Sequence, residues 1–190
     1  MSRLVCFTGK MGVGKSEAIK LLNSSDTVLV KFAQPLYDMQ EYIYNRISSV
    51  YARPESFIKD RKLLQWLGTE WGRDTISQTL WVDLWKAEVT KNLSRGKLVV
   101  CDDVRFDNEA QAVKSLGGLT IKIISDKTDK RIDTQSGINN HSSEAGIHYS
   151  YIDAMVENNG TLEEFQAKLT HLYGMLGVGN SATTESTEHA

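Results

Sequence analysis

The sequence predicts a single doubly wound α/β domain, built on a five-stranded parallel sheet with helices on both faces. Five apolar or β-branched runs, at residues 4–7, 27–32, 97–101, 119–124 and 151–158, alternate with helical patterns. A length of 190 residues is enough for one such domain with insertions. No internal repeat and no linker divides the chain, so we expect one domain over residues 1–176 and a flexible tail over 177–190.

The composition excludes several classes of protein. The formal net charge is −2, which gives no sign of binding to polymeric nucleic acid. No stretch approaches 18 apolar residues and no signal-like leader precedes the first strand, so we expect a soluble, cytoplasmic protein with no membrane partner. Cys6 and Cys101 lie in apolar runs, which is typical of reduced, structural thiols.

The first strand, 4–7, leads into Gly9–Ser16, which matches the phosphate-loop pattern G-x-x-x-x-G-K-S/T, and a helical pattern follows. Glycines at three positions let the backbone turn its N–H groups toward one point, where a polyphosphate binds. Lys15 is expected to reach the β- and γ-phosphates, and the Ser16 hydroxyl to bind Mg²⁺. The predicted nucleotide-binding residues are Gly9, Met11, Gly12, Val13, Gly14, Lys15 and Ser16. The alternative is a strand-to-helix turn that matches by chance.

Residues 35–80 are predicted to form a helical insertion after the second strand. A helix begins near Pro35, Asp60 can cap a further helix, and 67–74 is an unusual turn with two glycines, an aromatic side chain and three charges. One interpretation is that Arg73 binds a substrate phosphate and Trp71 walls a base pocket. The other is a helix–helix corner with a partly buried Trp and a solvated Arg. The helix over 80–94 carries Trp81 and Trp85 four residues apart, which suits core or interface packing.

The strand at 97–101 ends in two carboxylates, Asp102 and Asp103. An acid at this position beside a phosphate loop is where Mg²⁺ or its water shell is held, and we assign the metal to at least one of the pair. Alternatively, either could cap the next helix. Arg105 points to the same rim, and Glu109 lies close enough to orient it. That pair could steady phosphoryl charge, or it could be a weak surface ion pair.

The region over 125–147 is long and polar, and we expect a lid that closes over the nucleotide and supplies Arg131 as a charge clamp. A disordered segment is the alternative. After the strand at 151–158, Thr161 and Glu164 form a capping box that opens a helix to about Tyr173.

Taken together, these motifs resemble the P-loop nucleoside monophosphate kinases, and more closely the bacteriophage deoxynucleoside monophosphate kinases. The likeness covers most of residues 3–173. It is carried by the phosphate loop and by four further runs, namely Lys31–Leu36, Leu67–Arg73, Asp102–Ala110 and His141–Glu144. Family members often have an acidic residue where Gln34 stands and a proline where Asp107 stands.

The resemblance implies a CORE part with the sheet, an NMP-binding part at 35–80 and a LID at 125–147. It implies the reaction ATP + dNMP giving ADP + dNDP, with Mg²⁺ as cofactor. By position it makes Asp103 and Arg105 active-site residues with Glu109 behind them, Arg73 the ligand of the acceptor phosphate, and Arg131 the lid residue. It also allows a homodimer, for which the Trp81/Trp85 face is one candidate surface.

Two other functions fit the motifs. Another small-metabolite P-loop kinase, such as a coenzyme-precursor or shikimate-type enzyme, would share the loop and the strand-end acid. A non-catalytic switch would bind a nucleoside triphosphate without an acceptor. The sequence does not predict which bases are accepted.

Overall fold

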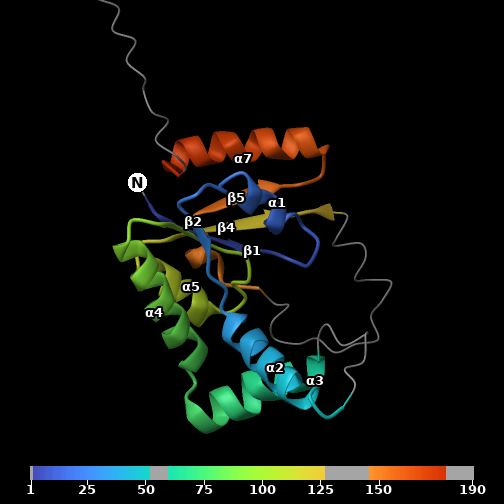
Figure 1. Ribbon diagram of the computed structural model, residues 1–190. Helices are drawn as coiled ribbons and strands as arrows, with labels where there is room; N and C mark the ends of the chain where they lie inside the picture. Colours follow the sequence, from blue (N-terminus) through green and yellow to red (C-terminus); the bar gives the residue numbers. More distant parts are fainter. Residues whose placement is uncertain (1, 52–59, 127–145, 179–190) are drawn as a thin grey trace, which may run out of the picture.

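The computed structural model describes residues 2–51, 60–126 and 146–178, and it confirms the predicted fold class. A five-stranded sheet has the order β2-β3-β1-β4-β5, and every neighbouring pair is parallel. The strands are β1 (Leu4–Thr8), β2 (Thr27–Leu29), β3 (Leu98–Cys101), β4 (Leu119–Ile124) and β5 (Ala154–Glu157). Because β1 lies between β3 and β4, the loop that follows β1 opens at the centre of the sheet (Figure 1).

Helices cover both faces of the sheet. On one side lie α1 (Lys15–Lys20) and α7 (Leu162–Leu176), and on the other lie α4 (Leu80–Ser94) and α5 (Asp107–Ser115) (Figure 1). Side chains alternate along β1, so that Leu4 and Cys6 join the core under α4 and α5, while Val5 and Phe7 join the core under α1 and α7. Both faces of the central strand are therefore buried, as a continuous apolar run predicts.

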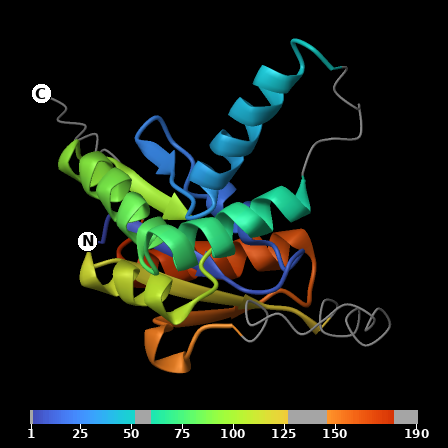
Figure 2. The same ribbon diagram turned by 90° about the horizontal axis from the view of Figure 1, so that it is seen from below.

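The remaining helices form an arm that projects from the carboxyl edge of the sheet. We call this the helical arm; it consists of α2 (Gln34–Ile47), α3 (Arg61–Trp66) and the π-helix η1 (Leu67–Ile76). Figure 2 shows η1 in front of the sheet and α2 running outward beside it. The predicted cap is confirmed, because the Asp60 carboxylate accepts from the backbone N–H of Leu63 at 3.0 Å.

The structure corrects the prediction of a turn over 67–74. These residues continue α3 as a π-helical segment, and Gly72 lets it approach the ring of Trp81 closely, while Gly68 faces the side chain of Leu36 in α2. The Trp81 indole N–H donates to the carbonyl of Gly68 at 2.8 Å, and a Cβ on Gly72 would lie 2.3 Å from the Trp81 ring. The glycines therefore serve helix packing and not chain reversal.

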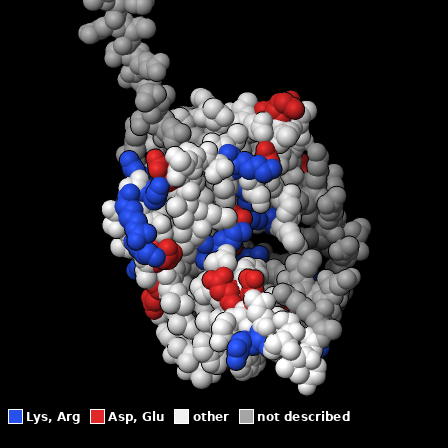
Figure 3. Space-filling model, viewed as in Figure 1, with Lys and Arg blue, Asp and Glu red and all other residues white. Residues whose placement is uncertain are grey.

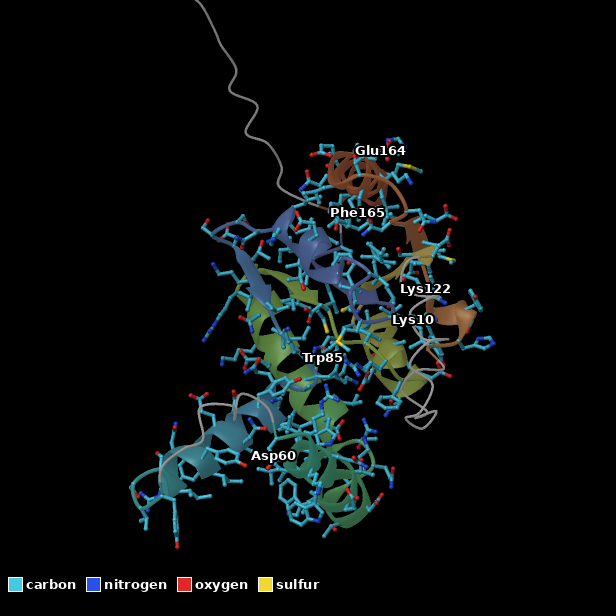
Figure 4. All side chains as sticks on the ribbon, turned by 90° about the vertical axis from the view of Figure 1, so that its right-hand side faces the viewer. Lys10, Asp60, Trp85, Lys122, Glu164 and Phe165 are labelled. Carbon is cyan, nitrogen blue, oxygen red and sulfur yellow. The ribbon has the colours of Figure 1, made fainter. Side chains whose placement is uncertain are left out.

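The two tryptophans of α4 belong to the core. Trp81 and Trp85 are 3% and 2% exposed, so the idea that their face is a dimer surface is wrong for these rings. Trp85 stacks on Phe32 at 4.2 Å between ring centroids and donates to the carbonyl of Val30 (Figure 4). This stacking fixes the chain just before α2, where the helical arm leaves the sheet.

Several predicted boundaries shift. The strand β2 ends at Leu29, not at residue 32, and residues 149–151 form a short 3-10 helix before β5. Helix α7 continues to Leu176, and Val178 beyond it is buried, with its backbone N–H bonded to the carbonyl of Tyr173. The tail predicted from residue 177 therefore still packs at 177–178; the rest, 179–190, lies outside the described residues. No helix in the described ranges is long and apolar enough to cross a bilayer.

Candidate active site

The phosphate loop lies between the end of β1 and the start of α1, at the carboxyl edge of the sheet. Its glycines have positive φ values of 139° at Gly9, 83° at Gly12 and 106° at Gly14. A Cβ on Gly9 would lie 2.3 Å from the carbonyl oxygen of Ile123, so only glycine fits there. The side chain of Met11 is 86% exposed.

The lysine of the loop folds back onto it. Lys15 Nζ donates to the carbonyls of Gly9 at 2.7 Å and Lys10 at 2.9 Å. Its pKa is lowered from 10.5, first by burial and then by the nearby Arg105, while Asp102 and Asp103 oppose the shift. The cation thus lies among charged groups of the segment that follows β3. On the face seen in Figure 3, Lys and Arg side chains gather beside a hollow between the sheet and the helical arm.

Asp103 binds the backbone of the two residues that precede the helical arm. Its Oδ1 accepts from the N–H of Phe32 and its Oδ2 accepts from the N–H of Ala33, each at 3.0 Å. The Cys101 thiol lies 3.1 Å from the same Oδ1. Both oxygens are therefore committed to the residues that precede α2, where the carboxylate fixes the start of the helical arm.

Asp102 is oriented differently. Lys31 Nζ donates to Oδ2 at 3.2 Å and lies 3.0 Å from Oδ1, but at an angle that makes no hydrogen bond. Within the described residues, Oδ1 is the buried side-chain oxygen that accepts no hydrogen bond. A buried carboxylate oxygen that accepts no hydrogen bond is suited to a cation, and here the Lys31 ammonium is the cation that lies beside it. Neither aspartate caps α5, whose N-cap is Phe106, so the capping alternative is wrong.

The residues around this oxygen fit Mg²⁺. The described ranges contain no cluster of three or more His, Cys, Asp or Glu side chains that could hold a metal by themselves. Mg²⁺ in phosphotransferases usually needs only one or two protein oxygens, since substrate phosphates and waters complete its shell. Asp102 Oδ1 is one such oxygen, and the exposed Ser16 hydroxyl of the phosphate loop is the second candidate.

A second group of charges lies where η1 meets α5. Arg73 Nη2 is 3.8 Å from Glu109 Oε1, and its guanidinium lies 4.4 Å from the centre of the Phe106 ring. Glu109 Oε2 accepts from the backbone N–H groups of Arg105 at 2.8 Å and Phe106 at 3.2 Å. Glu109 thus fixes the backbone of the turn that carries Arg105 and lies beside the guanidinium of Arg73, while its orientation of the Arg105 side chain stays a prediction.

Burial dominates the titration of Glu109. The residue is 4% exposed, and desolvation raises its pKa from 4.5 to about 7, against the effect of the two backbone N–H groups and Arg73.

Asp107, at the position where family members often have proline, accepts from the backbone N–H of His148 at 2.7 Å. That contact ties the start of α5 to the segment before β5.

The ring of Trp71 does not share the neighbours of the Arg73 guanidinium. Its ring packs 6.4 Å from that of Trp81 and lines a groove of about 410 Å³ between α2 and η1. The groove is lined by Asp38, Met39, Tyr42, Ile43, Leu67 and Trp71. Base stacking by Trp71 stays a prediction, and the structure gives the ring a packing role in the helical arm as well.

Two active-site neighbours escaped the sequence-based prediction. Lys31 pairs with Asp102, and Asn158 at the end of β5 bonds to the back of the phosphate loop. Lys31 begins the run Lys31–Leu36 but was given no role there, and Asn158 belongs to no motif; the strand order brings them close to Asp102 and to the phosphate loop. The predicted lid residue Arg131 and the run His141–Glu144 lie outside the described residues.

Comparisons with known proteins bear on the fold and on the family. The dephospho-CoA kinase from Campylobacter jejuni has a similar structure, with a TM-score of 0.52, 15% identity, and coverage of 93% of this chain and 98% of that one. At that identity the likeness shows the fold alone.

Sequence relatives are more specific. The deoxynucleotide monophosphate kinase of Enterobacteria phage T4 is 27% identical over 134 residues, which cover 70% of this chain and 53% of that protein. The deoxynucleoside-5'-monophosphate kinase of Escherichia phage T5 is 29% identical over 101 residues, 50% of this chain and 38% of that protein. The chain thus spans about half the length, or less, of these curated relatives. The family profile described as deoxynucleotide monophosphate kinase matches residues 10–169, and the chain therefore belongs to the deoxynucleotide monophosphate kinase family.

Proposed function

We propose that this protein transfers the γ-phosphate of ATP to a deoxynucleoside monophosphate, giving ADP and a deoxynucleoside diphosphate, with Mg²⁺ as cofactor. The observation that carries the proposal is the convergence of the phosphate-loop lysine, Lys15, with Arg105 and the aspartate pair at the carboxyl edge of the sheet. Family membership supports the choice of acceptor. The matched relatives are longer than this chain, so the residues of the site carry the proposed activity.

The chemistry needs positioning and charge neutralisation, and no covalent enzyme intermediate. An oxygen of the dNMP phosphate attacks the γ-phosphorus, the bond from that phosphorus to the β–γ bridging oxygen breaks, and ADP leaves. Lys15 would move from the carbonyls of Gly9 and Lys10 to the β- and γ-phosphates. Arg105 would neutralise charge on the transferred group.

The acceptor phosphate is assigned to Arg73. Its guanidinium is held by Glu109 and Phe106, and a planar fork of donors matches a phosphate group. Mg²⁺, when bound, would neutralise charge between the β- and γ-phosphates, and the residues that would hold it are Asp102 and Ser16. We therefore prefer Asp102 to Asp103 for the metal, because both oxygens of Asp103 already accept backbone N–H groups.

Five further assignments stay predictions. The NMP-binding part is placed at about 35–80 and the lid at 125–147, with Arg131 closing over the nucleotide. Trp71 is proposed to contact the acceptor base. The reaction is placed in the cytoplasm, or the host cytoplasm if the chain is phage-encoded, where both small-molecule substrates occur. Sedimentation velocity would test whether the protein forms a homodimer. The buried Trp81 and Trp85 rings would not form the contact between its subunits.

A coupled ADP-release assay with ATP, Mg²⁺ and each of the four dNMPs tests the proposal. We expect acceptor-dependent ADP release with at least one dNMP, and its loss in Lys15→Met, which keeps a side chain of similar length without the charge. No stimulation by any dNMP would overturn the proposal. Release stimulated only by a non-nucleotide acceptor would indicate another small-metabolite kinase, and tight ATP binding without stimulated turnover would indicate a switch.

A further inference from the structure

We propose that Asn158 is a positioning residue for the phosphate loop, which orients the Gly14 amide for the nucleoside triphosphate. The inference rests on the proposed function, because it assigns an effect on the donor nucleotide. It starts from one contact across 145 residues of sequence: Asn158 Nδ2 donates to the carbonyl oxygen of Val13 at 2.9 Å. No sequence motif includes this residue.

The carbonyl that Asn158 holds belongs to the same peptide group as the Gly14 N–H. In a trans peptide the C=O and the N–H point in opposite directions, and the structure has no cis peptide bond in its described ranges. A bond that holds the Val13 oxygen on the Asn158 side therefore turns the Gly14 N–H to the other side of the loop. Donors turned inward are what a phosphate cradle needs.

Asn158 is itself fixed from two directions. Its backbone N–H donates to the carbonyl of Ile124 at 2.9 Å, and its own carbonyl accepts from the Ser125 hydroxyl at 2.8 Å. Both partners lie at the end of β4, next to β1 in the sheet. The backbone of Asn158 is therefore held by the sheet, and its side-chain amide can in turn link the phosphate loop to the end of β4.

The space behind the loop is closed. A Cβ on Gly14 would lie 2.7 Å from Asn158 Nδ2 and 3.0 Å from the ring of Phe165, which is 2% exposed. Figure 4 shows Phe165 below α7, on the side of the sheet, with Glu164 beside it facing outward. Gly14 has a φ of 106°, so the close approach and the backbone conformation both require glycine here.

The chemistry of the side chain matters as much as its size. A carboxylate in its place has no N–H to donate, would face the Val13 carbonyl with an acceptor, and would add negative charge near the triphosphate. Asn158→Asp therefore keeps the shape while removing the interaction. The next residue provides a matched control, since Asn159 Oδ1 accepts from the backbone N–H of Asp126 at 2.9 Å, and a carboxylate can accept equally well.

The experiment measures equilibrium binding of a fluorescent ATP analogue, together with KM for ATP and KM for the best dNMP. The proteins are the wild type, Asn158→Asp, Asn158→Ala and Asn159→Asp. We expect the Kd for the ATP analogue and the KM for ATP to rise about fivefold in Asn158→Ala, the effect of one lost hydrogen bond, and more in Asn158→Asp. We expect the KM for dNMP to stay as in the wild type in the Asn158 variants. The Asn159→Asp control should keep the wild-type melting temperature.

The outcomes separate the two proposals. If the wild type binds no ATP analogue, the proposed function fails. If the wild type binds it and both Asn158 variants bind it equally well, the positioning role is overturned while the function stands. An equal loss of affinity for ATP and dNMP, accompanied by a lower melting temperature, would also overturn it, because Asn158 would then support the fold and not the loop.

Discussion

The same substitution, Asp→Asn, separates the roles of the two neighbouring carboxylates at the end of β3. In Asp103→Asn an amide NH₂ replaces one of two carboxylate oxygens that accept from the N–H groups of Phe32 and Ala33. One charge-assisted hydrogen bond is lost, and a partly buried donor then faces another donor. We expect a loss of about 2–3 kcal/mol in the free energy of unfolding.

Asp102→Asn should lower activity and leave stability nearly unchanged. It weakens a partly buried ion pair with Lys31, which contributes about 1 kcal/mol, so the fold should be nearly as stable as the wild type. Its Oδ1, however, is the oxygen proposed to bind Mg²⁺. We expect kcat to fall about 100-fold and the Mg²⁺ concentration for half-maximal rate to rise.

Two measurements on each variant test which aspartate supports the fold and which binds Mg²⁺. They are urea unfolding and turnover across a Mg²⁺ titration. For a chain of this size, 2–3 kcal/mol corresponds to a melting temperature lower by about 5–10 °C in Asp103→Asn. The assignment is refuted if Asp103→Asn is as stable as the wild type and needs more Mg²⁺, while Asp102→Asn keeps the wild-type Mg²⁺ response.

Three further predictions follow from the helical arm and its contacts. Arg73→Lys should raise the KM for dNMP at least about tenfold with little change for ATP, because an ammonium cannot reproduce the fork held by Glu109 and Phe106; equal rises in both KM values would contradict the assignment. Glu109 has a folded pKa of about 7, above 4.5 in the unfolded chain, so the folded state binds the extra proton. Its contribution to stability is complete below about pH 4.5 and is lost as the pH rises through 7, by up to about 3 kcal/mol; pH-dependent urea unfolding should show a shallower decline over this window in Glu109→Gln, and an unchanged slope would count against the raised pKa. Gly72→Ala should destabilise the protein by about 2–3 kcal/mol, because a Cβ there meets the Trp81 ring. Gly174→Ala in α7 is the control, because a Cβ there meets nothing within 4 Å, and it should raise the melting temperature slightly. Calorimetry compares the two variants, and equal melting temperatures would contradict the close packing of η1 on Trp81.

The sequence was sufficient for the fold because its periodicities are strong and local. The buried run of β1 and the glycines after it need no tertiary information to be interpreted, and the helix Leu80–Ser94 was placed with its observed bounds. The errors fall where tertiary contacts override local patterns. Gly68 and Gly72 indicate a turn by composition, yet the Trp81 ring, which contacts both, draws them into a continuous π-helix.

The site was predicted less completely, for a physical reason. Motif spacing brings Lys15 and the β3 carboxylates together because parallel strands share a carboxyl edge, but it does not encode contacts between distant strands. Lys31 follows β2 at one edge of the sheet, and Asn158 follows β5 at the other edge. Their contacts with Asp102 and Val13 depend on the order of the strands in the sheet. Only a residue-level structure assigns them.

The aspartate pair shows why residue type alone is insufficient to assign a role. Asp102 and Asp103 are adjacent and chemically identical, and alternation along the chain end directs their side chains to different partners. One meets the backbone N–H groups at the start of the helical arm, and the other meets a lysine and keeps an oxygen without a donor. Asp103 therefore fixes the backbone that precedes the helical arm, while Asp102 keeps the oxygen that we propose for Mg²⁺. Under that proposal, two adjacent acids of the same type divide a structural role and a metal-binding role between them.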